Sequence, residues 1–305
     1  MAILSEDKMQ GNIIEIGTDN KKLSARAGFL QISEQNKLIK EIPFDTIFSV
    51  VVTSPLVTYT QPLLQRLSEE GIVVIVCGKN YIPCGIYMPL IGNYKQNYVQ
   101  RAQFSAGIVL QKRIWQQIVI EKVKHQASVL QIFNKRDLLT PLLEQITSGD
   151  SKNIEAVAAK KYFNLLFGKN FRRDTEQEGI NSFLNYGYAV IRACVARFVV
   201  AVGLCPTLGV KHQNKLNPLC LVDDLMEPFR PIADYEVYKI FTENKLEADA
   251  ELMPEHKRKL AGILDKTLKA DNICSPVYLI IEDYVRQYAD SVIAGKANLC
   301  SRYEL

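Results

Sequence analysis

The sequence predicts an α+β protein with a β-sandwich-like N-terminal domain that contains one helix, followed by an all-α C-terminal domain. The first 95 residues consist of short runs rich in β-branched residues and bounded by Gly, Pro and Asn, whereas the periodicity from residue 101 onward is helical. A chain of 305 residues, 48% of them hydrophobic and 23% charged, is long enough to bury two cores. We therefore expect domains at 1–95 and 101–305, joined by a polar linker near residues 92–100.

Strands and a single helix are predicted for the N-terminal domain. The strands are expected where β-branched residues cluster or alternate with polar ones, in the stretches 12–17, 22–33, 46–53, 71–78 and 81–89. The segment TQPLLQRLSEEG, residues 60–71, interrupts them with the spacing of an amphipathic helix. Its last residue, Gly71, suits the left-handed position that often follows a helix C-terminus. This domain is therefore expected to be a compact sheet structure with an inserted helix.

Helices are predicted for the rest of the chain. Apolar residues recur with helical spacing in the stretches 103–133, 136–147, 152–167, 179–203, 222–246, 255–270 and 276–295. The most apolar of these, YAVIRACVARFVVAVGLC, contains Arg192 and Arg197. A membrane-spanning helix would have to bury both charges in lipid, so we expect a core helix and no membrane segment.

The cysteines and the N-terminus bear on the cellular compartment. The chain has seven cysteines, which are scattered and form no CxxC pair. Reduced thiols fit this pattern, whereas zinc ribbons and disulfide scaffolds do not. The N-terminal MAILSEDKMQ lacks the basic-then-apolar order of a signal peptide. A cytoplasmic location is therefore expected.

Positive charge is concentrated in one part of the chain. The net charge is +4 overall, but residues 1–100 contain nine basic and nine acidic side chains and so contribute nothing to it. Residues 152–215 contain ten basic and four acidic side chains. An acidic polymer such as DNA is a plausible partner for this region, and a solvated basic surface without a partner is an equally good explanation of charge alone.

Three residues of the C-terminal half are candidates for a functional site, namely Glu155, His212 and Asp224. Each also has an ordinary structural explanation. Glu155 lies one turn into a predicted helix for which Ser151 would be the N-cap, where a carboxylate gains about 0.3–1 kcal/mol from the helix dipole. His212 lies in the loop GVKHQN and could simply bond to the backbone. Asp224 and its neighbour Asp223 could cap the helix that follows.

The adjacent acids are harder to explain as helix caps. Asp223 and Asp224 lie within the apolar run CLVDDLMEPF, where two ionised and desolvated carboxylates repel each other. A divalent cation or adjacent bases would relieve this repulsion. Glu155, His212 and Asp224 together are a suitable ligand set for Mg²⁺ or Mn²⁺, and a metal ion beside a basic surface favours phosphoryl chemistry. Three such residues spread over about seventy positions are not, however, a specific pattern.

The amino-acid sequence of the whole segment is more specific than these three residues. LGVKHQNKLNPLCLVDDLMEPFRP, preceded by the helix EAVAAKKYF, resembles the CRISPR-associated integrase that acquires new spacers. The shared motifs are a Glu followed by Ala and an aromatic-rich stretch, then LG-x-x-H, then a hydrophobic run ending in DLMEPFRP. TYTQPLLQRLSEEGIVVIVCG and QRAQF are also similar to this family, and the length and motifs resemble its members from type II systems. The family's β domain followed by a helical catalytic domain matches the predicted layout.

The resemblance assigns roles to single residues. It implies that Glu155, His212 and Asp224 are catalytic metal ligands, because they occupy the motif positions of the family's Glu, His and Asp. Asp223 falls where other members often carry Tyr or another residue, so it is expected only to tune the site. The FRP arginine is expected to contact the site or to buttress it. The candidates for DNA contacts are Lys160, Lys161, Lys211, Lys215 and Arg230. An exposed lysine without a ligand explains the two loop lysines equally well.

The resemblance also implies an activity and partners. It implies a metal-dependent DNA integrase and endonuclease, in which the 3′-hydroxyls of a double-stranded DNA fragment attack the CRISPR repeat, one strand at a time. The protein would be a homodimer assembled around a small ferredoxin-like partner, the second CRISPR-associated protein. Two alternatives stay open on the residues alone. One is an unrelated metal-dependent nuclease with the same ligand types, and the other is a non-catalytic DNA-binding assembly module whose acids are helix caps.

Overall fold

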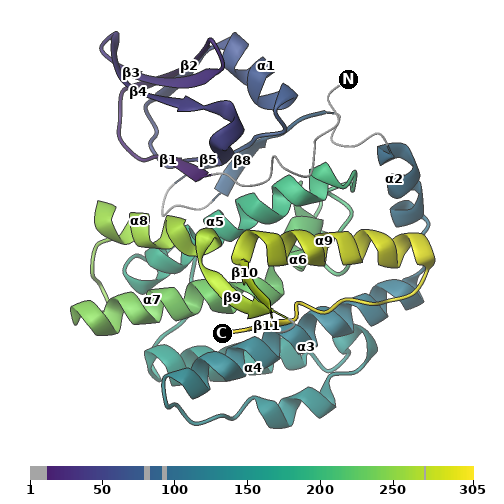
Figure 1. The fold of residues 1–305 in the computed structure, drawn as a ribbon. Helices are drawn as coiled ribbons and strands as arrows, with labels where there is room; N and C mark the ends of the chain where they lie inside the picture. Colours follow the sequence, from purple (N-terminus) through teal and green to yellow (C-terminus); the bar gives the residue numbers. More distant parts are fainter. Residues whose placement is uncertain (1–11, 79–82, 91–94, 271–272) are drawn as a thin grey trace.

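The computed structural model describes residues 12–78, 83–90, 95–270 and 273–305 (Figure 1). The N-terminal part consists of strands and one α-helix. Their bounds are Asn12–Ile16 (β1), Lys21–Arg26 (β2), Phe29–Glu34 (β3), Lys37–Pro43 (β4), Ile47–Val52 (β5), Val57–Tyr59 (β6), Gln61–Glu69 (α1), Val73–Cys77 (β7) and Pro83–Tyr87 (β8). The beginning of the predicted strand 81–89 and linker residues 92–94 lie outside the described residues.

The strands form two four-stranded sheets. One has the order β1-β5-β7-β8, in which β1, β5 and β7 are parallel and β8 is antiparallel to β7. The other has the order β4-β3-β2-β6. Apolar side chains from both sheets and from α1 share one core, which includes Leu23, Leu30, Val50 and Leu63. Burying one face of each sheet in this way stabilises both of them.

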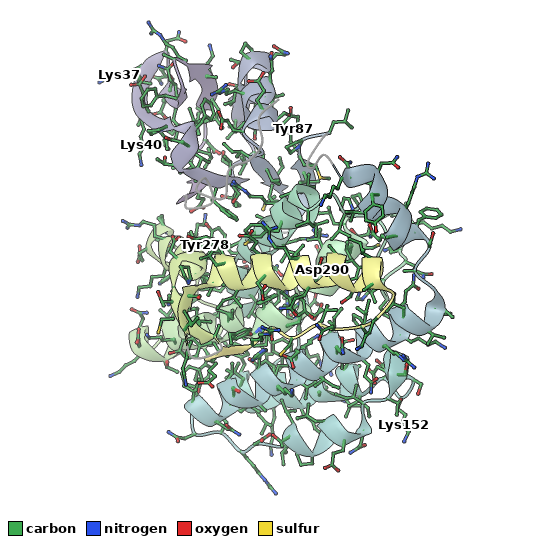
Figure 2. All side chains as sticks on the ribbon, turned by 45° about the vertical axis from the view of Figure 1, so that its right-hand side comes forward. Lys37, Lys40, Tyr87, Lys152, Tyr278 and Asp290 are labelled. Atoms are coloured by element: carbon green, nitrogen blue, oxygen red, sulfur yellow. The ribbon has the colours of Figure 1, made fainter. Side chains whose placement is uncertain are left out.

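One strand of this part has no clear signal in the sequence. β4 lies at the edge of its sheet, and its first five residues are exposed, so it lacks the apolar alternation that identifies a half-buried strand. Its lysines Lys37 and Lys40 point outward at the far end of the N-terminal part (Figure 2). Two tight turns set the register. Ala27 and Gly28 join β2 to β3 with positive φ at both positions, and the next hairpin turn has the same conformation.

The C-terminal part is mainly helical. Its α-helices are Gln96–Phe104 (α2), Ile108–Ile132 (α3), Ile154–Phe167 (α4), Ile180–Ala201 (α5), Cys220–Leu225 (α6), Arg230–Asn244 (α7), Pro254–Ala261 (α8) and Val277–Ala294 (α9). Short 3₁₀ segments lie at Thr140–Gln145 (η4) and Glu227–Phe229 (η6). The α+β class is confirmed, and α4, α5 and α9 lie close to the predicted helices. The predicted helix 103–133 is wrong in one respect, because the helical conformation is interrupted between the end of α2 at Phe104 and the start of α3 at Ile108. The predicted linker likewise overlaps α2.

The expectation of an all-α C-terminal domain is wrong. A three-stranded antiparallel sheet lies there, in the order β10-β9-β11, formed by Thr267–Ala270 (β9), Ile273–Pro276 (β10) and Tyr303–Glu304 (β11). The predicted helix 255–270 therefore ends early, at Ala261 of α8, and its last four residues form β9 instead. Pairing with a strand from the end of the chain, which lies far away in sequence, overrides local helical periodicity here.

Helix α5 forms the centre of the structure. Nineteen of its twenty-two residues are buried, including Arg197, and 94% of its most apolar stretch is covered by other parts of the protein. Arg197 lies over the ring of Phe48 in β5 at 4.2 Å and donates a hydrogen bond to the carbonyl of Ile47. The same helix packs Ala189 and Ala193 against Val51 and Ile75 of the sheet. This confirms the prediction of a core helix.

Candidate active site

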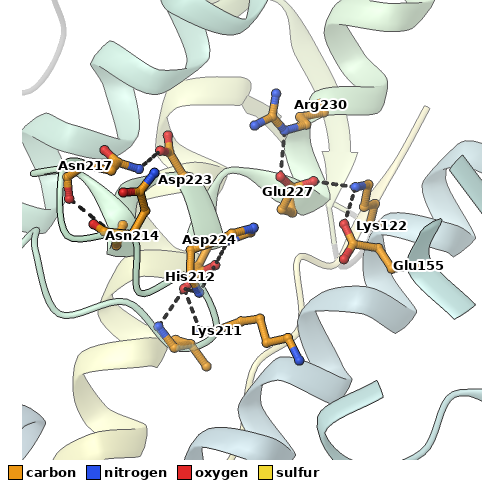
Figure 3. Close-up of polar contacts among 12 residues, drawn as sticks. Lys122, Glu155, Lys211, His212, Asn214, Asn217, Asp223, Asp224, Glu227 and Arg230 are labelled. Atoms are coloured by element: carbon orange, nitrogen blue, oxygen red, sulfur yellow. Dashed lines mark hydrogen bonds and ion pairs between the residues drawn. The ribbon is translucent and has the colours of Figure 1, made fainter. Parts of the chain in front are cut away.

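Asp224 organises the loop that carries the candidate histidine (Figure 3). It lies in α6 and its side chain is completely buried. One carboxylate oxygen, Oδ2, accepts hydrogen bonds from the backbone N–H groups of Val210 at 2.6 Å and Lys211 at 2.8 Å. The other oxygen, Oδ1, accepts from Nδ1 of His212 at 2.5 Å. The buried charge is thus compensated by several donors, and in return it fixes the conformation of the loop.

The glycine of the LG-x-x-H motif is required by the closeness of this loop to α6. A Cβ atom at Gly209 would lie 2.3 Å from the carbonyl oxygen of His212, 2.8 Å from the Cβ of Cys220 and 3.0 Å from Oδ2 of Asp224. Backbone atoms cannot move away as a flexible side chain could, so any larger residue would push the loop off the aspartate. The motif's Gly, His and Asp therefore belong to one packed unit.

His212 combines a fixed ring with partial exposure. Its side chain is 49% exposed, and its ring packs edge-to-face on Trp115 with the centroids 5.8 Å apart. The hydrogen bond to Asp224 raises the pKa of His212, and this effect outweighs the opposing effect of burial. Since Nδ1 is used by the aspartate, Nε2 is the ring nitrogen that remains for a ligand.

Asp223 is held by a different set of partners from its neighbour. Its two oxygens pair with Arg192 of α5, with Oδ1 to Nε at 2.6 Å and Oδ2 to Nη2 at 2.7 Å. Asn217 donates a further hydrogen bond to Oδ2 at 2.6 Å. This pairing ties α5 to the loop before α6. Of the two ways to relieve repulsion between adjacent acids, the contacts show adjacent bases.

Glu155 lies at the N-terminus of α4, as predicted, but the cap residue is not the predicted one. Asp150, and not Ser151, satisfies the free N–H groups of this helix. Its carboxylate accepts hydrogen bonds from the backbone of Ile154 at 2.8 Å and of Glu155 at 2.9 Å. The N-cap residue Asn153 has a left-handed backbone, which brings the earlier aspartate under the helix end. The helix end is therefore anchored by Asp150, and the side chain of Glu155 is left for another role.

A buried lysine, Lys122 of α3, lies between Glu155 and Glu227. Its Nζ is 2.6 Å from Oε1 of Glu155 and 2.5 Å from Oε2 of Glu227 (Figure 3). Glu227 in turn pairs with Arg230, whose Nε lies 2.9 Å from Oε1. Sequence reasoning assigned no role to Lys122 or Glu227. A signal was present, because Lys122 continues the buried stripe of Trp115 and the residues that follow it with helical spacing.

Opposite charges keep this buried group ionised. Burial opposes the charge of Glu227, yet Arg230 and Lys122 together lower its pKa to about 2. Burial likewise opposes the charge of Lys122, and the two glutamates more than compensate, so that its pKa is raised. Arg230 also lies over the ring of Tyr188 at 4.6 Å, and Tyr188 donates a hydrogen bond to the buried Asp234. These contacts favour the buttressing role for the FRP arginine.

The three predicted ligands do not converge on one point. Among the described residues, no three His, Cys, Asp or Glu side chains are close enough together to hold a metal ion. His212 and Asp224 are in contact, whereas Glu155 is held by Lys122. The donor chemistry nevertheless fits Mg²⁺ or Mn²⁺, because carboxylate oxygens suit a hard cation and an imidazole nitrogen is available beside them. The position beside Glu155 also suits positive charge, since an ammonium already lies there.

The lysines predicted to contact DNA are exposed. This group comprises Lys160, Lys161, Lys211 and Lys215. Not every basic residue of the region 152–215 is available in this way, because Arg192 is paired with Asp223 and Arg197 is buried against Phe48. Lys152 is exposed and lies at the end of the molecule opposite the N-terminal part (Figure 2). The accessible positive charge is therefore smaller than the residue count indicates.

Known proteins resemble this chain over most of its length. The family described as CRISPR associated protein Cas1 matches residues 14–268. The CRISPR-associated endonuclease Cas1 of Neisseria meningitidis serogroup C (strain 8013) is 36% identical over 248 residues, which cover 80% of this chain and 80% of that protein. The CRISPR-associated endonuclease Cas1 2 of Pyrobaculum aerophilum is 26% identical over 276 residues, which cover 83% of this chain and 90% of that protein.

Solved structures resemble the fold. A casposase bound to an integration product matches with a TM-score of 0.78 at 19% identity, covering 95% of this chain and 93% of that one. A CAS1 protein from Thermotoga maritima matches with a TM-score of 0.77 at 15% identity, covering 92% and 97%. A chain of a Cas6-RT-Cas1–Cas2 complex matches with a TM-score of 0.79 at 18% identity, covering 97% of this chain and 36% of that one. At these identities the similarity establishes the fold.

Proposed function

Since the chain belongs to the Cas1 family of CRISPR-associated proteins, we propose that it is a metal-dependent DNA integrase and endonuclease that inserts foreign DNA fragments as new spacers into a CRISPR repeat array. The observation that carries the proposal is the contact between His212 and the buried Asp224 beside an exposed basic loop. A half-exposed imidazole fixed by a buried carboxylate is suited to hold a ligand and not merely to fill a core. Relatives named as endonucleases and a fold neighbour bound to an integration product support the same activity.

The reaction proposed is a transesterification. The 3′-hydroxyl oxygen of the incoming fragment forms a bond to a phosphorus atom at the repeat, and the bond from that phosphorus to the 3′-oxygen of the preceding nucleotide breaks. The attacking hydroxyl loses its proton and the leaving 3′-oxygen gains one. The number of phosphodiester bonds is unchanged, so no external energy source is required. With water in place of the 3′-hydroxyl, the same site would nick DNA, which is the endonuclease activity.

Residues of this chain would hold a divalent ion and place the DNA. Glu155, His212 and Asp224 are the proposed ligands, through carboxylate oxygens and an imidazole nitrogen, and the hydrogen bond between His212 and Asp224 has to open for both to bind one ion. A bound Mg²⁺ or Mn²⁺ would polarise a phosphate oxygen and help to hold the nucleophile in line. Asp224 keeps the loop in shape by accepting the N–H groups of Val210 and Lys211. Lys211 and Lys215 on the same loop are exposed and would bind neighbouring phosphates.

The proposed partners are nucleic acid and protein. The DNA partners are a double-stranded fragment and the CRISPR repeat. We further propose a homodimer that assembles around Cas2, a small ferredoxin-like protein. The fold similarity to a chain of a Cas6-RT-Cas1–Cas2 complex, an assembly that contains Cas2, supports a Cas2 partner.

An integration assay with single variants tests the proposal. A labelled fragment and a repeat-bearing plasmid are incubated with the protein and Cas2, with Mg²⁺, with Mn²⁺ and with chelator. Glu155→Ala and His212→Ala should each abolish joining and nicking, and a double variant should lose no more than a single one, because the ligands act as one unit. The control is Lys37→Ala, which removes an exposed charge of β4 in the N-terminal part, away from the site.

The outcomes separate the alternatives. Hydrolysis without joining would favour an unrelated metal-dependent nuclease. DNA binding that is unchanged by Glu155→Ala, together with no metal binding and no reaction in the wild type, would favour a non-catalytic assembly module. If His212→Ala joined strands at the wild-type rate, or chelator had no effect, the proposed metal site would be wrong.

A further inference from the structure

After α9 the chain turns back and runs along α3 (Figure 1). We call residues 298–305 the strap. The backbone N–H of Leu299 donates a hydrogen bond to Oε1 of Gln117 at 3.0 Å. The backbone N–H of Ser301 donates one to Oε2 of Glu121 at 3.2 Å, one turn further along α3. The strap is therefore bound in register to one face of this helix.

Ser301 fixes the position of the strap in a way that apolar packing would not. Its hydroxyl is buried and lies 2.7 Å from Oε2 of Glu121 and 2.6 Å from Nε2 of His125. Because a hydroxyl carries one proton, it donates to the carboxylate and accepts from the imidazole N–H. Both partners are buried, so a shift of the strap by one residue would leave buried polar groups unpaired. These contacts thus specify which strap residues meet α3.

Tyr303 extends the strap from α3 to η6. Its ring stacks on that of His125, with the centroids 3.7 Å apart and the planes 13° apart. The ring of Phe229 in η6 lies 5.8 Å away on a nearly parallel plane. The Tyr303 hydroxyl donates a hydrogen bond to the carbonyl of Pro228 at 2.6 Å. One buried side chain thus contacts both α3 and the middle of η6.

The position of η6 matters because this segment belongs to the candidate site. It carries Glu227, which pairs with Lys122 opposite the proposed ligand Glu155. A three-residue 3₁₀ segment has poor hydrogen-bond geometry of its own, and Pro228 has no N–H to donate. The position of η6 therefore depends on contacts with its surroundings, and the hydrogen bond from Tyr303 is one of them.

We propose that Tyr303 is a positioning residue for the integrase site, which holds η6 against α3 and thereby fixes the carboxylate of Glu227 beside Glu155. The inference rests on the proposed function, since it concerns the site of that reaction. The Tyr303 side chain is buried, so it acts through η6 and not by touching DNA. Because a displacement of about 1 Å can slow a reaction strongly without weakening substrate binding, the contact should affect the rate and not the affinity for DNA.

Tyr303→Phe tests this with a minimal change, because it removes only the hydroxyl and keeps the ring between His125 and Phe229. We expect kcat for strand joining to fall about five- to tenfold, with KM for the DNA fragment unchanged. In the metal-free protein, the amides of residues 226–232 should exchange with deuterium about fivefold faster. Ser301→Ala, which loosens the strap at α3 without touching η6, should change both quantities in the same direction.

Tyr284→Phe is the matched control. Tyr284 is fully buried, and its ring packs edge-to-face on the same Phe229 with the centroids 5.3 Å apart. Among the residues that the structure describes, its hydroxyl has no hydrogen-bond partner. The control therefore removes the same group from the same core without removing a hydrogen bond to η6. Joining and exchange should stay at their wild-type values.

The experiment is the integration assay with the intact chain and Cas2 over a range of fragment concentrations, together with deuterium exchange of the metal-free protein and thermal melts. Slower joining and faster exchange in Tyr303→Phe, but not in Tyr284→Phe, is the expected result. Joining at the wild-type kcat by Tyr303→Phe, or equal losses in both variants, would make Tyr303 a core residue only and would overturn the inference.

Two further outcomes are decided by the other measurements. If Tyr303→Phe did not fold, Ser301→Ala would decide the question, since wild-type joining would overturn the inference and slower joining with unchanged KM would support it. No joining by the wild type would overturn the proposed function instead, whereas the exchange comparison would still show whether Tyr303 holds η6.

Discussion

Asp224 is predicted to be needed for stability even before any metal or DNA is bound. Asp224→Ala removes a carboxylate with no exposed surface and leaves four donors without their acceptor. Three of these are the backbone N–H groups of Val210, Lys211 and, at a longer 3.4 Å, His212, and the fourth is Nδ1 of His212. A hydrogen bond to a charged group contributes about 1.5–3 kcal/mol, and an orphaned buried donor costs about 1–3 kcal/mol. Because His212 can turn towards water, we expect a total loss of about 3–5 kcal/mol in the free energy of unfolding.

The assay is thermal and urea unfolding of the metal-free protein in chelator. Asp224→Ala should lower the melting temperature by about 6–10 °C. Glu155→Ala is the matched control, because it also removes one proposed ligand, but its carboxylate is partly exposed and its partner Lys122 keeps Glu227. We expect a loss of about 1 kcal/mol or less for this variant.

Asp224→Ala should affect DNA binding as well as stability. Loss of the aspartate should loosen the loop from Gly209 to His212, so Asp224→Ala should weaken DNA binding through Lys211, whereas Glu155→Ala should leave DNA binding intact. If Asp224→Ala unfolded within about 1 kcal/mol of the wild type, the hydrogen bonds seen here would not hold the loop, and the reasoning would be refuted.

Three further predictions concern acid, salt and assembly. Burial lowers the pKa of His125 to about 4. As the pH falls, the unfolded chain therefore takes up a proton before the folded protein does, and the free energy of unfolding should drop by about 2 kcal/mol between pH 6.5 and pH 5. Urea unfolding checks this, and His125→Gln should lose much of the pH dependence. Replacing Lys160, Lys161 and Lys211 together by Ala should reduce the slope of log K for DNA against log salt by about 2–3, and an unchanged slope would place DNA on another face. The protein should sediment as a dimer at micromolar concentration through residues 1–95, where Phe29, Leu38, Ile39 and Leu56 are exposed, and a single monomer boundary would contradict this.

The sequence predicted best those elements whose burial is decided locally. Helix α5 is mostly apolar and is buried along most of its 22 residues, and α9 has a regular stripe of buried residues, so periodicity located both within two residues. The strand β9 could not be predicted, because its partners are β10 and the two residues at the end of the chain. Strand β4 was missed because its first five residues are all exposed, so buried and exposed residues do not alternate along it. Its position is set by the turn at Gln35 and Asn36.

For the candidate site, residue types were predictable and their pairing was not. The motif wording identified Glu155, His212 and Asp224, and the structure places two of them in contact. The role of Lys122 depends on the packing of α3 against α4 and η6, and no spacing along the chain encodes which glutamates its ammonium will meet. A charged residue in a buried stripe was the available signal, because burying a lysine is costly unless the fold supplies opposite charge.

The adjacent aspartates are stabilised without a metal ion. Consecutive residues of a helix project about 100° apart, so Asp223 and Asp224 reach separate partners although they are neighbours in sequence. Arg192 neutralises one, while the His212 ring and three backbone N–H groups compensate the other, and their mutual repulsion needs no ion. Glu155 is different, because its ion-pair partner Lys122 also forms an ion pair with Glu227. Metal binding to Glu155 is therefore the measurement on which the proposed chemistry depends.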